Sequence, residues 1–384
     1  MKVFSNIIEK YKINTIPSKI FWRMVYLLST VPKTAFNKGI GENKVLIFQL
    51  LHLGDLVISI PLINYLSNGI NKNSVDILVS EKNLDLANRI KNINKVYFIK
   101  GDWNDRVKHE YGYLSFSEIV QFIKMIYVLY QNKYAKIYLL NNDEYSKLFV
   151  NLINWGTLRQ LPNENLYFKN IKGKDTEQLH QSDYIFSIID DYKIPIRQRQ
   201  NYDIAIWNGE RDKIADLISP YKIKQKIIVL HVDARVPAKS WADHNWEAVI
   251  TFFTKQSCRI FIIGSKSDKH RRRLFPIGVT DIRGMLSIGE LIVLLSESDL
   301  FIGTDSGPGH LTNISKTPSI ILFSAANSSQ WWKPLNPNAI VITKEVACHD
   351  CHKIICPYDN LCMNLIKPKE VILHAKNILN QPME

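Results

Sequence analysis

The sequence predicts an α/β protein made of two doubly wound, Rossmann-like domains that face a cleft. From residue 44 onward, short runs of Val, Ile and Leu alternate with helical patterns, which is typical of parallel sheets covered on both faces. The polar, proline-containing segment 194–201 (IPIRQRQN) interrupts the alternation, which then restarts. We therefore expect one domain at 44–200 and a second at 201–384, preceded by a basic, amphipathic segment at 1–43.

The predicted strands are continuous apolar runs, and the predicted helices have apolar residues at helical spacing. In the first domain we expect strands at 44–50, 75–79, 95–99 and 136–140, and helices at 56–66 and 115–130. In the second domain we expect strands at 226–231, 259–263, 300–302 and 318–323, and helices at 245–254, at 288–296 and from about residue 311. Doubly wound sheets bind ligands at the carboxyl ends of their strands, so we expect the site in the cleft between the domains.

The composition describes a globular protein and not a disordered one. The 384 residues are 46% hydrophobic and 22% charged, and they suffice for two domains. No run of 18 uncharged apolar residues is present to span a bilayer, and residues 1–14 lack the apolar core of a signal peptide. We therefore expect a cytoplasmic protein.

The net charge of +13 indicates an anionic partner or a role in solvation. Basic residues are spread along the chain apart from the run 269–273 (KHRRR), and no helix-turn-helix, RNA-recognition or zinc-finger pattern accompanies them. The sequence therefore predicts no nucleic-acid partner. Anionic lipid headgroups or a phosphorylated glycolipid would fit the charge.

The N-terminal segment contains a basic, amphipathic helical pattern. Apolar residues at helical spacing are flanked by basic ones: Ile20, Met24, Leu27, Leu28 and Val31, with Lys19, Arg23, Lys33 and Lys38. Such a helix can lie peripherally in the interface of an anionic leaflet. It can equally pack its apolar face on the globular body, and the sequence leaves both readings open.

The segment 303–310 (GTDSGPGH) follows a predicted strand and precedes a predicted helix. A strand, a Gly-rich turn and a helix start together point free backbone N–H groups at an anion. The segment also carries a carboxylate, a hydroxyl and an imidazole, in Asp305, Ser306 and His310, beside Gly307. We expect a phosphate-bearing ligand here. The alternative is that Asp305 and Ser306 only cap the helix.

Three further loops carry polar residues after predicted strands. Asp55 follows strand 44–50 and can act as a general base or cap the next helix. Arg235 and Lys239 follow the first strand of the second domain, where they can neutralise a diphosphate or remain solvated. Asp268 follows strand 259–263 and can accept hydrogen bonds from a ribose or start a helix.

Four of the five cysteines lie within 15 residues: Cys348, Cys351, Cys356 and Cys362. In a cytosolic chain this spacing favours a structural metal over disulfides, with zinc preferred to iron. Reduced thiols or disulfides are the alternatives, and His349 and His352 are alternative ligands.

Taken in order, these loops resemble those of the bacterial ADP-heptose:lipopolysaccharide heptosyltransferases, glycosyltransferase family 9. Segment 304–334 is similar to the family's D-[ST]-G-x-x-H block and the strand after it. Segment 53–66 (LGDLVISIPLINYL) is similar to its G-D-[VL] loop, and segment 238–246 (AKSWADHNW) to its K-x-W segment. The resemblance runs from about residue 44 to about residue 375.

The resemblance implies a fold of the glycosyltransferase B type, in which the C-terminal domain holds the nucleotide sugar and the N-terminal domain the acceptor. Asp55 matches the family's catalytic base and Lys239 its phosphate-binding lysine. The residues that match the block holding diphosphate and sugar are Asp305, Ser306, Gly307 and His310. The family inverts the anomeric carbon in one displacement, and no catalytic metal is expected.

The sequence departs from the family pattern at two donor-binding positions. Asp268 stands where the family usually has a ribose-binding Glu, and it is shorter by one methylene. Ala234 and Arg235 occupy places where small hydroxyl residues often precede the lysine. These changes affect the ribose and phosphate contacts that the resemblance implies.

The leading reading is an inverting transferase that moves heptose from ADP-heptose to an inner-core lipopolysaccharide acceptor. A near alternative uses another nucleotide sugar with a surface polysaccharide or protein acceptor. A different class with the same two-domain architecture is a nucleotide-sugar epimerase, although the sequence contains no block resembling the additional carboxylates of those enzymes.

Overall fold

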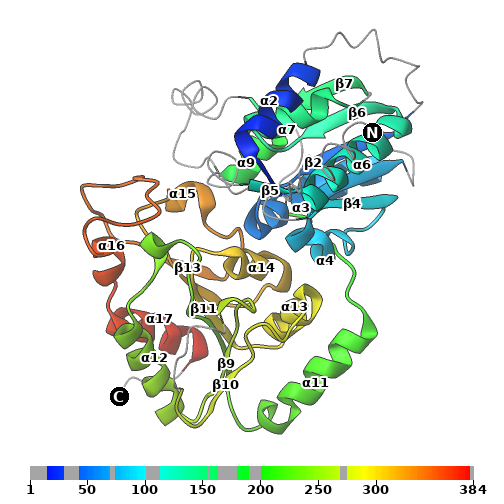
Figure 1. Cartoon of the computed structure of the whole chain (residues 1–384). Helices are drawn as coiled ribbons and strands as arrows, with labels where there is room; N and C mark the ends of the chain where they lie inside the picture. Colours follow the sequence, from blue (N-terminus) through cyan, green and yellow to red (C-terminus); the bar gives the residue numbers. More distant parts are fainter. Residues whose placement is uncertain are drawn as a thin grey trace. The chain divides into compact units, whose positions relative to one another are not determined.

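Two all-parallel sheets form the framework of the protein (Figure 1). The computed structural model describes residues 15–29, 43–69, 74–100, 113–153, 155–162, 180–189, 200–268 and 275–380. The chain divides into unit 1, Met1–Thr176 with Ser182–Asn201, and unit 2, Glu177–Gln181 with Tyr202–Glu384. The expected boundary after residue 200 lies next to the division at Asn201. The basic run 269–273, the segment 194–199 and residues Val31, Lys33 and Lys38 lie outside the described residues.

Unit 1 contains a five-stranded sheet in the order β4-β3-β2-β6-β7. The strands are β2 (Val45–Gln49), β3 (Val75–Ser80), β4 (Lys95–Ile99), β6 (Tyr134–Leu139) and β7 (Trp155–Gln160). The helices are α2 (Ser18–Ser29), α3 (Leu53–Gly69), α4 (Leu84–Ala87), α6 (Phe116–Asn132) and α7 (Glu144–Asn151), with the 3-10 turn η2 (Glu81–Asn83); α9 (Gln181–Phe186) begins in unit 2 and continues into unit 1. A separate antiparallel pair, β1 (Thr15–Pro17) and β5 (Tyr113–Ser115), precedes α2 and α6.

Unit 2 contains a six-stranded sheet in the order β10-β9-β8-β11-β12-β13. The strands are β8 (Ile227–His231), β9 (Arg259–Ile262), β10 (Val279–Asp281), β11 (Leu300–Thr304), β12 (Ser319–Leu322) and β13 (Ala339–Ile342). The helices are α11 (Asn208–Lys222), α12 (Asp243–Lys255), α13 (Ile288–Ser296), α14 (Gly307–Ser315), α15 (Ser329–Trp332), α16 (Leu361–Asn364) and α17 (Pro368–Leu379), with η4 (Pro237–Lys239) after β8. One face is covered by α12 and α17, and the other by α11, α13 and α14 (Figure 1).

Both sheets have the strand order of a Rossmann-like fold. Renumbered within each unit, the order is 3-2-1-4-5 in unit 1 and 3-2-1-4-5-6 in unit 2. The order reverses between β2 and β6 in unit 1 and between β8 and β11 in unit 2. Such switch points open a crevice at the carboxyl ends of the strands, where ligands bind. The predicted α/β class with two Rossmann-like parts is confirmed.

One predicted boundary at the most informative motif is wrong. The sequence placed the helix from about residue 311, but α14 begins at Gly307, so the turn after β11 contains only Asp305 and Ser306. Gly-Pro-Gly is a poor helix former in a helix interior, yet proline fits the first helical turn, where its missing N–H needs no partner. The helix N-terminus therefore lies directly at the residues expected to bind an anion.

Each unit has its own apolar core. In unit 1, the face of β2 that carries Leu46 and Phe48 packs under α2, α6 and α7. In unit 2, Trp241 and Trp246 meet edge to face at 4.9 Å between ring centroids, and Trp241 Nε1 donates to Ile366 O (3.0 Å). This contact fixes the loop between η4 and α12. Within the described residues, no helix combines the length and the apolar character needed to cross a bilayer.

Candidate functional site

The candidate donor site lies at the switch point of unit 2, where β8 and β11 run side by side. Gly303 of β11 is opposite His231 of β8 in the parallel register. A Cβ atom at Gly303 would lie 2.7 Å from Phe301 Cζ and 3.2 Å from His231 Cβ, so only glycine fits between these side chains. The glycine thereby lets the His231 side chain approach the loop that follows β11.

Lys239 and Asp305 form an ion pair across this switch point. Lys239 ends the turn η4 after β8, and its Nζ contacts Oδ2 of Asp305, which directly follows β11. Asn327 Nδ2 donates to the same carboxylate oxygen (3.1 Å). Lys239 is half-buried and Asp305 is buried, so their attraction is less screened than that of a surface pair. The structure brings together two residues that the sequence predicted separately.

The N-terminus of α14 presents backbone N–H groups beside this pair. Ser306 stands at the N-cap position, but its side chain does not cap the helix. Instead, Ser306 Oγ donates to Thr304 O (2.9 Å) and lies 3.1 Å from His231 Nδ1. Since the hydroxyl has one hydrogen, which Thr304 O accepts, Nδ1–H of a neutral His231 is the donor. The first-turn N–H groups of α14, including those of Gly307 and Gly309, remain available to an anion.

Two buried histidines at the site are held in their neutral form. Burial lowers the pKa of His231, against the opposing effect of Asp233 and Asp268. Burial also lowers the pKa of His310, from 6.5 to about 4, against the opposing charge of Asp305; the charges of His180 and Lys239 lower the pKa further. His310 Nδ1 is fully buried and has no hydrogen-bond partner among the described residues, nor has Thr304 Oγ1. A buried polar atom of this kind is costly unless a ligand or water satisfies it.

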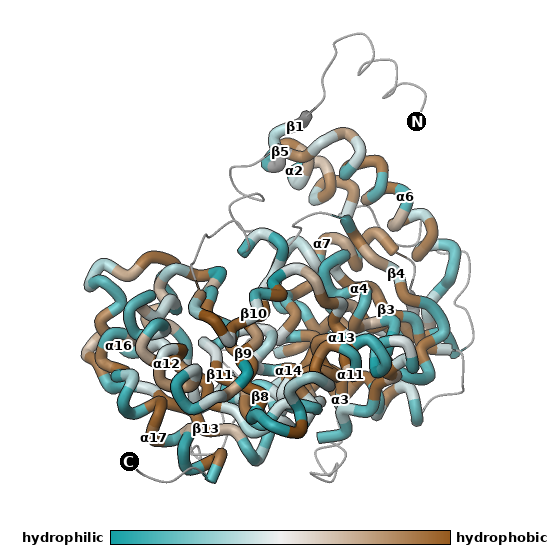
Figure 2. The backbone as a smooth tube through the Cα atoms, turned by 90° about the horizontal axis from the view of Figure 1, so that it is seen from below, coloured by the Kyte–Doolittle hydropathy of each residue, from teal (hydrophilic) through white to brown (hydrophobic). Residues whose placement is uncertain are grey.

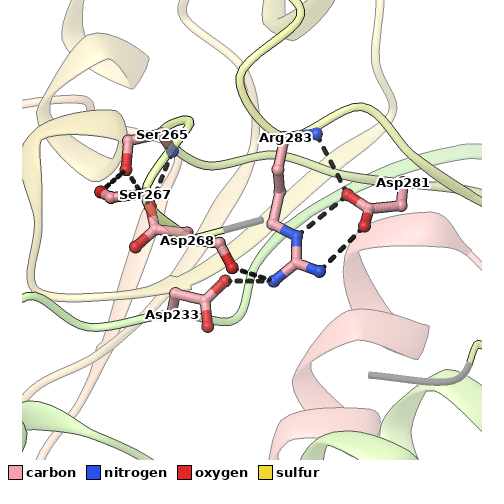
Figure 3. A network of polar contacts seen from close by, with 6 residues as sticks. All are labelled: Asp233, Ser265, Ser267, Asp268, Asp281 and Arg283. Carbon is pink, nitrogen blue, oxygen red and sulfur yellow. Dashed lines mark hydrogen bonds and ion pairs between the residues drawn. The ribbon is translucent and has the colours of Figure 1, made fainter. Parts of the chain in front are cut away.

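A buried arginine ties together the loops after β8, β9 and β10 (Figure 3). Arg283 forms two bonds to Asp281, through Nε to Oδ1 (3.0 Å) and through Nη2 to Oδ2 (2.8 Å). Its Nη1 donates to Asp233 Oδ2 (3.0 Å) and to the backbone oxygen of Asp268 (2.9 Å). The arginine therefore joins the carboxyl ends of three neighbouring strands.

Asp268 uses its carboxylate within its own loop. Its Oδ2 accepts from Ser265 N (2.7 Å) and Ser265 Oγ (2.6 Å), as in a turn that starts a helix (Figure 3). Asp268 lies in the loop after β9, the strand next to β8, and the hydrogen bonds of its carboxylate stay within that loop. Arg235 is exposed on the loop after β8.

The cysteine segment supports the turn that carries Lys239. Asn360 Nδ2 donates to the carbonyl oxygens of Pro237 (2.8 Å) and Ser240 (3.2 Å), on either side of Lys239. Ala238 N donates to Ile354 O (3.0 Å). The segment between Cys348 and Cys362 therefore fixes η4 from outside the sheet.

The structure has no disulfide at the four cysteines of this segment or at Cys258. Cys362 is buried, and its Sγ accepts from Ala325 N (3.4 Å), while the other three thiols are half-buried. Burial raises the pKa of Cys362, and Cys356 and Cys348 lie near enough to raise it further. Within the described chain, no three His, Cys, Asp or Glu side chains are gathered for metal binding. Metal at these cysteines stays a prediction.

Asp55 lies in the first turn of α3, at the switch point of unit 1. Its Oδ2 accepts from His52 N (3.1 Å), while Leu56 N donates to His52 O (3.1 Å), so the carboxylate takes part in the helix start. Amide side chains anchor the preceding loop: Asn141 Oδ1 accepts from Leu50 N (3.0 Å) and Asn83 Nδ2 donates to Leu51 O (2.8 Å). This half-buried carboxylate is held on a rigid loop.

Sequence reasoning missed several residues that build the site. Asn327, Asn360 and Arg283 position the predicted residues, and Asn83 and Asn141 fix the Asp55 loop. The asparagines follow strands or lie in turns, where they are common for local reasons and so carry no distinctive signal. Arg283 is a charged residue buried in the core, and its burial is explained by hydrogen bonds to three acceptor residues, which the sequence does not show.

The arrangement in unit 2 is suited to binding an anion that carries further hydrogen-bonding groups. It combines one lysine, a helix N-terminus, two neutral histidines and a buried ring nitrogen without a described partner. Phosphate groups favour such helix N-termini. The arrangement in unit 1 offers a carboxylate of the kind that acts as a general base.

Comparison with known proteins identifies the family of the chain. The family model for glycosyltransferase family 9 (heptosyltransferase) matches residues 131–362. Lipooligosaccharide heptosyltransferase 2 of Campylobacter jejuni is 28% identical over 183 residues, which are 43% of this chain and 57% of that protein. The chain therefore matches little more than half the length of this relative.

Two solved structures show the same fold at low sequence identity. The glycosyl transferase family 9 protein of Veillonella parvula has a TM-score of 0.70 at 16% identity, over 90% of this chain and 99% of that one. The ADP-heptose lipopolysaccharide heptosyltransferase II of Escherichia coli has a TM-score of 0.64 at 16% identity, over 88% of this chain and 98% of that one. With the family model covering more than half of its residues, the chain belongs to glycosyltransferase family 9, the heptosyltransferase family.

Proposed function

We propose that the protein is an inverting glycosyltransferase that moves heptose from ADP-heptose to an inner-core lipopolysaccharide acceptor. The observation that carries the proposal is the meeting of Lys239 and Asp305 at the N-terminus of α14, within a chain that belongs to this family. The Escherichia coli protein with the same fold is an ADP-heptose lipopolysaccharide heptosyltransferase, which supports the choice of donor.

In the proposed donor complex, Lys239 and the N–H groups of Gly307 and Gly309 hold the diphosphate. As the bond between the anomeric carbon and the phosphate oxygen breaks, its electron pair and the negative charge stay on ADP. A fixed ammonium and a helix N-terminus stabilise that charge without reorganising. Asp305 positions the ammonium through the ion pair, and the buried ring of His310 supplies a polar contact to the phosphates or the sugar.

Asp55 is the proposed base. It removes the proton of the acceptor hydroxyl while the oxygen forms a bond to the anomeric carbon, so the configuration at that carbon inverts. The hydrogen bond from His52 N stabilises the ionised form of the carboxylate, and the anchored loop limits its movement. Helix capping and catalysis by Asp55 are compatible, because each oxygen of a carboxylate can accept more than one hydrogen bond.

The proposal places the enzyme on the cytoplasmic face of the inner membrane, where a lipid-linked acceptor would be met. The four cysteines are proposed to hold a structural zinc ion, with iron as the alternative. Thiolates are ligands that both metals accept, and the cysteine segment supports η4. Metal bound there would stabilise the turn that carries Lys239. Elemental analysis of purified protein tests this part separately.

A transfer assay tests the proposal. Purified protein is given ADP-heptose, ADP-glucose or UDP-N-acetylglucosamine with a set of truncated core acceptors, and products are identified by mass spectrometry. We expect one added heptose on one inner-core acceptor, and only from ADP-heptose. Transfer from another nucleotide sugar would retain the reaction class but refute the donor. Epimerised donor without transfer would refute the transferase.

A further inference from the structure

Helix α2 has two apolar faces, and only one packs into unit 1. Phe21, Trp22 and Val25 are buried. Phe21 and Trp22 meet Phe122 of α6 edge to face, at 5.1 and 5.7 Å between ring centroids. The stripe singled out in the sequence is a different one, and it is exposed: Ile20, Met24, Leu27 and Leu28. Packing on the globular body therefore explains one face of α2 and leaves the other to be explained.

Helix α6 repeats this arrangement. Ile119, Phe122 and Leu129 are buried, while an outer stripe is exposed at positions that lie seven and four residues apart: Phe116, Ile123 and Tyr127, with Val128 beside it. Hydrophobic stretches run along both helices in Figure 2. A soluble monomer rarely exposes so many large apolar side chains on neighbouring elements without a function.

Helices α2 and α6 cover the same face of the sheet in unit 1. The buried sides of α2 and α6 belong to one cluster with Leu46 and Phe48, which point to one face of β2. Both helices therefore cover that face of the sheet, and their outer sides point away from it. We call the exposed residues the α2/α6 face: Ile20, Met24, Leu27, Leu28, Phe116, Ile123, Tyr127 and Val128.

The surroundings of the α2/α6 face are basic. Lys19, Arg23 and Lys124 are exposed on the two helices, whose one acidic residue, Glu118, is engaged in the capping box of α6. A second copy would oppose the same basic residues across a two-fold axis, which repels. An anionic surface attracts them, by about 1 kcal/mol for each basic residue near it.

We propose that the α2/α6 face inserts into an anionic lipid bilayer, with its apolar stripes at the boundary between headgroups and acyl chains. Tyrosine suits that depth because its ring is apolar and its hydroxyl polar, and Tyr127 of the α2/α6 face is exposed. The lysines and Arg23 meet the anionic headgroups. The inference rests on the proposed function only for the biological purpose of membrane binding. Membrane binding itself does not require sugar transfer.

Vesicle co-sedimentation of the full chain tests the inference. The vesicles are phosphatidylcholine alone, or phosphatidylcholine and phosphatidylglycerol in equal amounts, at low and high salt. The expected result is binding to the anionic vesicles that weakens as salt rises. Leu28→Ser with Tyr127→Ser removes side chains that are 58% and 64% exposed and should lower partitioning by roughly tenfold or more. The matched control is Ile223→Ser, at a residue 94% exposed in unit 2, which should bind as wild type does.

Charge is tested with a second pair of variants. Arg23→Glu should weaken binding to the anionic vesicles several-fold, whereas Lys224→Glu, at an exposed lysine of unit 2, should change it much less. Equal binding by wild type and the Leu28/Tyr127 variant would overturn the inference. The inference would also be overturned if the protein dimerised without vesicles, and if the Leu28/Tyr127 variant were monomeric but still bound vesicles as wild type does. Vesicle binding by a protein without transfer activity would refute the proposed function and leave this inference standing.

Discussion

Substitutions in the ion pair between Lys239 and Asp305 should affect stability and ADP affinity to different extents. The substitutions are Lys239→Met, Asp305→Asn and the two combined. The Asp305 side chain is 6% exposed and that of Lys239 is 17% exposed. Lysine's flexible stem allows its ammonium to reach water when its partner is lost, whereas the carboxylate stays buried with Asn327 as its remaining donor. The two single substitutions should therefore differ in their effect on stability.

The magnitudes follow from this asymmetry. At an effective dielectric constant of about 20, two charges about 4 Å apart attract by about 4 kcal/mol, and desolvation offsets much of this. Lys239→Met leaves a buried carboxylate uncompensated and should lower the free energy of unfolding by about 2–4 kcal/mol. Asp305→Asn should lower it by about 1–2 kcal/mol, and the double-mutant cycle should give a coupling of about 1–3 kcal/mol.

The assays are urea unfolding of the four proteins and calorimetric titration with ADP. If Lys239 also binds the diphosphate, Lys239→Met should weaken ADP binding by about 10- to 100-fold, since it removes a charge-assisted hydrogen bond. Asp305→Asn retains the ammonium and should weaken ADP binding by less than about tenfold. A coupling near zero would refute the ion pair. Unchanged ADP affinity in Lys239→Met would refute the donor site even if the coupling is found.

Three further predictions concern support, titration and packing. Asn360→Ala should weaken ADP binding about 3- to 10-fold at near wild-type thermal stability, because it removes both hydrogen bonds that fix the ends of η4. Calorimetric titration with ADP and thermal unfolding check this. Between pH 6.5 and about 4, the histidine at position 310 binds a proton in the unfolded chain but not when it is buried in the folded protein. The free energy of unfolding should therefore fall by about 3 kcal/mol as the pH falls through that window. His310→Gln should flatten this part of the pH profile measured by urea unfolding, and an unchanged slope would contradict the prediction. Gly303→Ala should destabilise unit 2 by about 1–3 kcal/mol, since its Cβ would lie 2.7 Å from a ring carbon, whereas Gly209→Ala in α11, with nothing within 4 Å, should be neutral or slightly stabilising.

The sequence predicted the repeating parts of the fold well, for a physical reason. Strands buried on both faces, such as 227–231 and 300–304, read as continuous apolar runs. The edge strands β7 and β10 have no such pattern and were not predicted; β13 is an apolar run of four residues and was also not predicted. The start of α14 was placed too late because Gly-Pro-Gly has low helix propensity, although the first turn accepts proline.

The candidate site was only partly predictable. Lys239 and Asp305 stand next to predicted strands, so their nearness followed from topology, but their pairing is a side-chain contact that no spacing shows. Arg283 and Asn360 act through contacts between loops far apart in the chain, which one sequence does not reveal. For α2, the sequence left open whether its apolar stripe lies in an anionic membrane interface or packs on the globular body. The structure packs a different side of the helix, through Phe21 and Trp22, and leaves Ile20, Met24, Leu27 and Leu28 exposed.

The role of Asp55 as the base is decided by the rate of heptose transfer from saturating ADP-heptose by Asp55→Asn. The amide has nearly the same shape and can still accept a hydrogen bond from His52 N, so the helix start is retained. It cannot take a proton. We expect a fall in kcat of about 10²- to 10⁴-fold with little change in the donor KM. A rate within about threefold of wild type would contradict the proposed base.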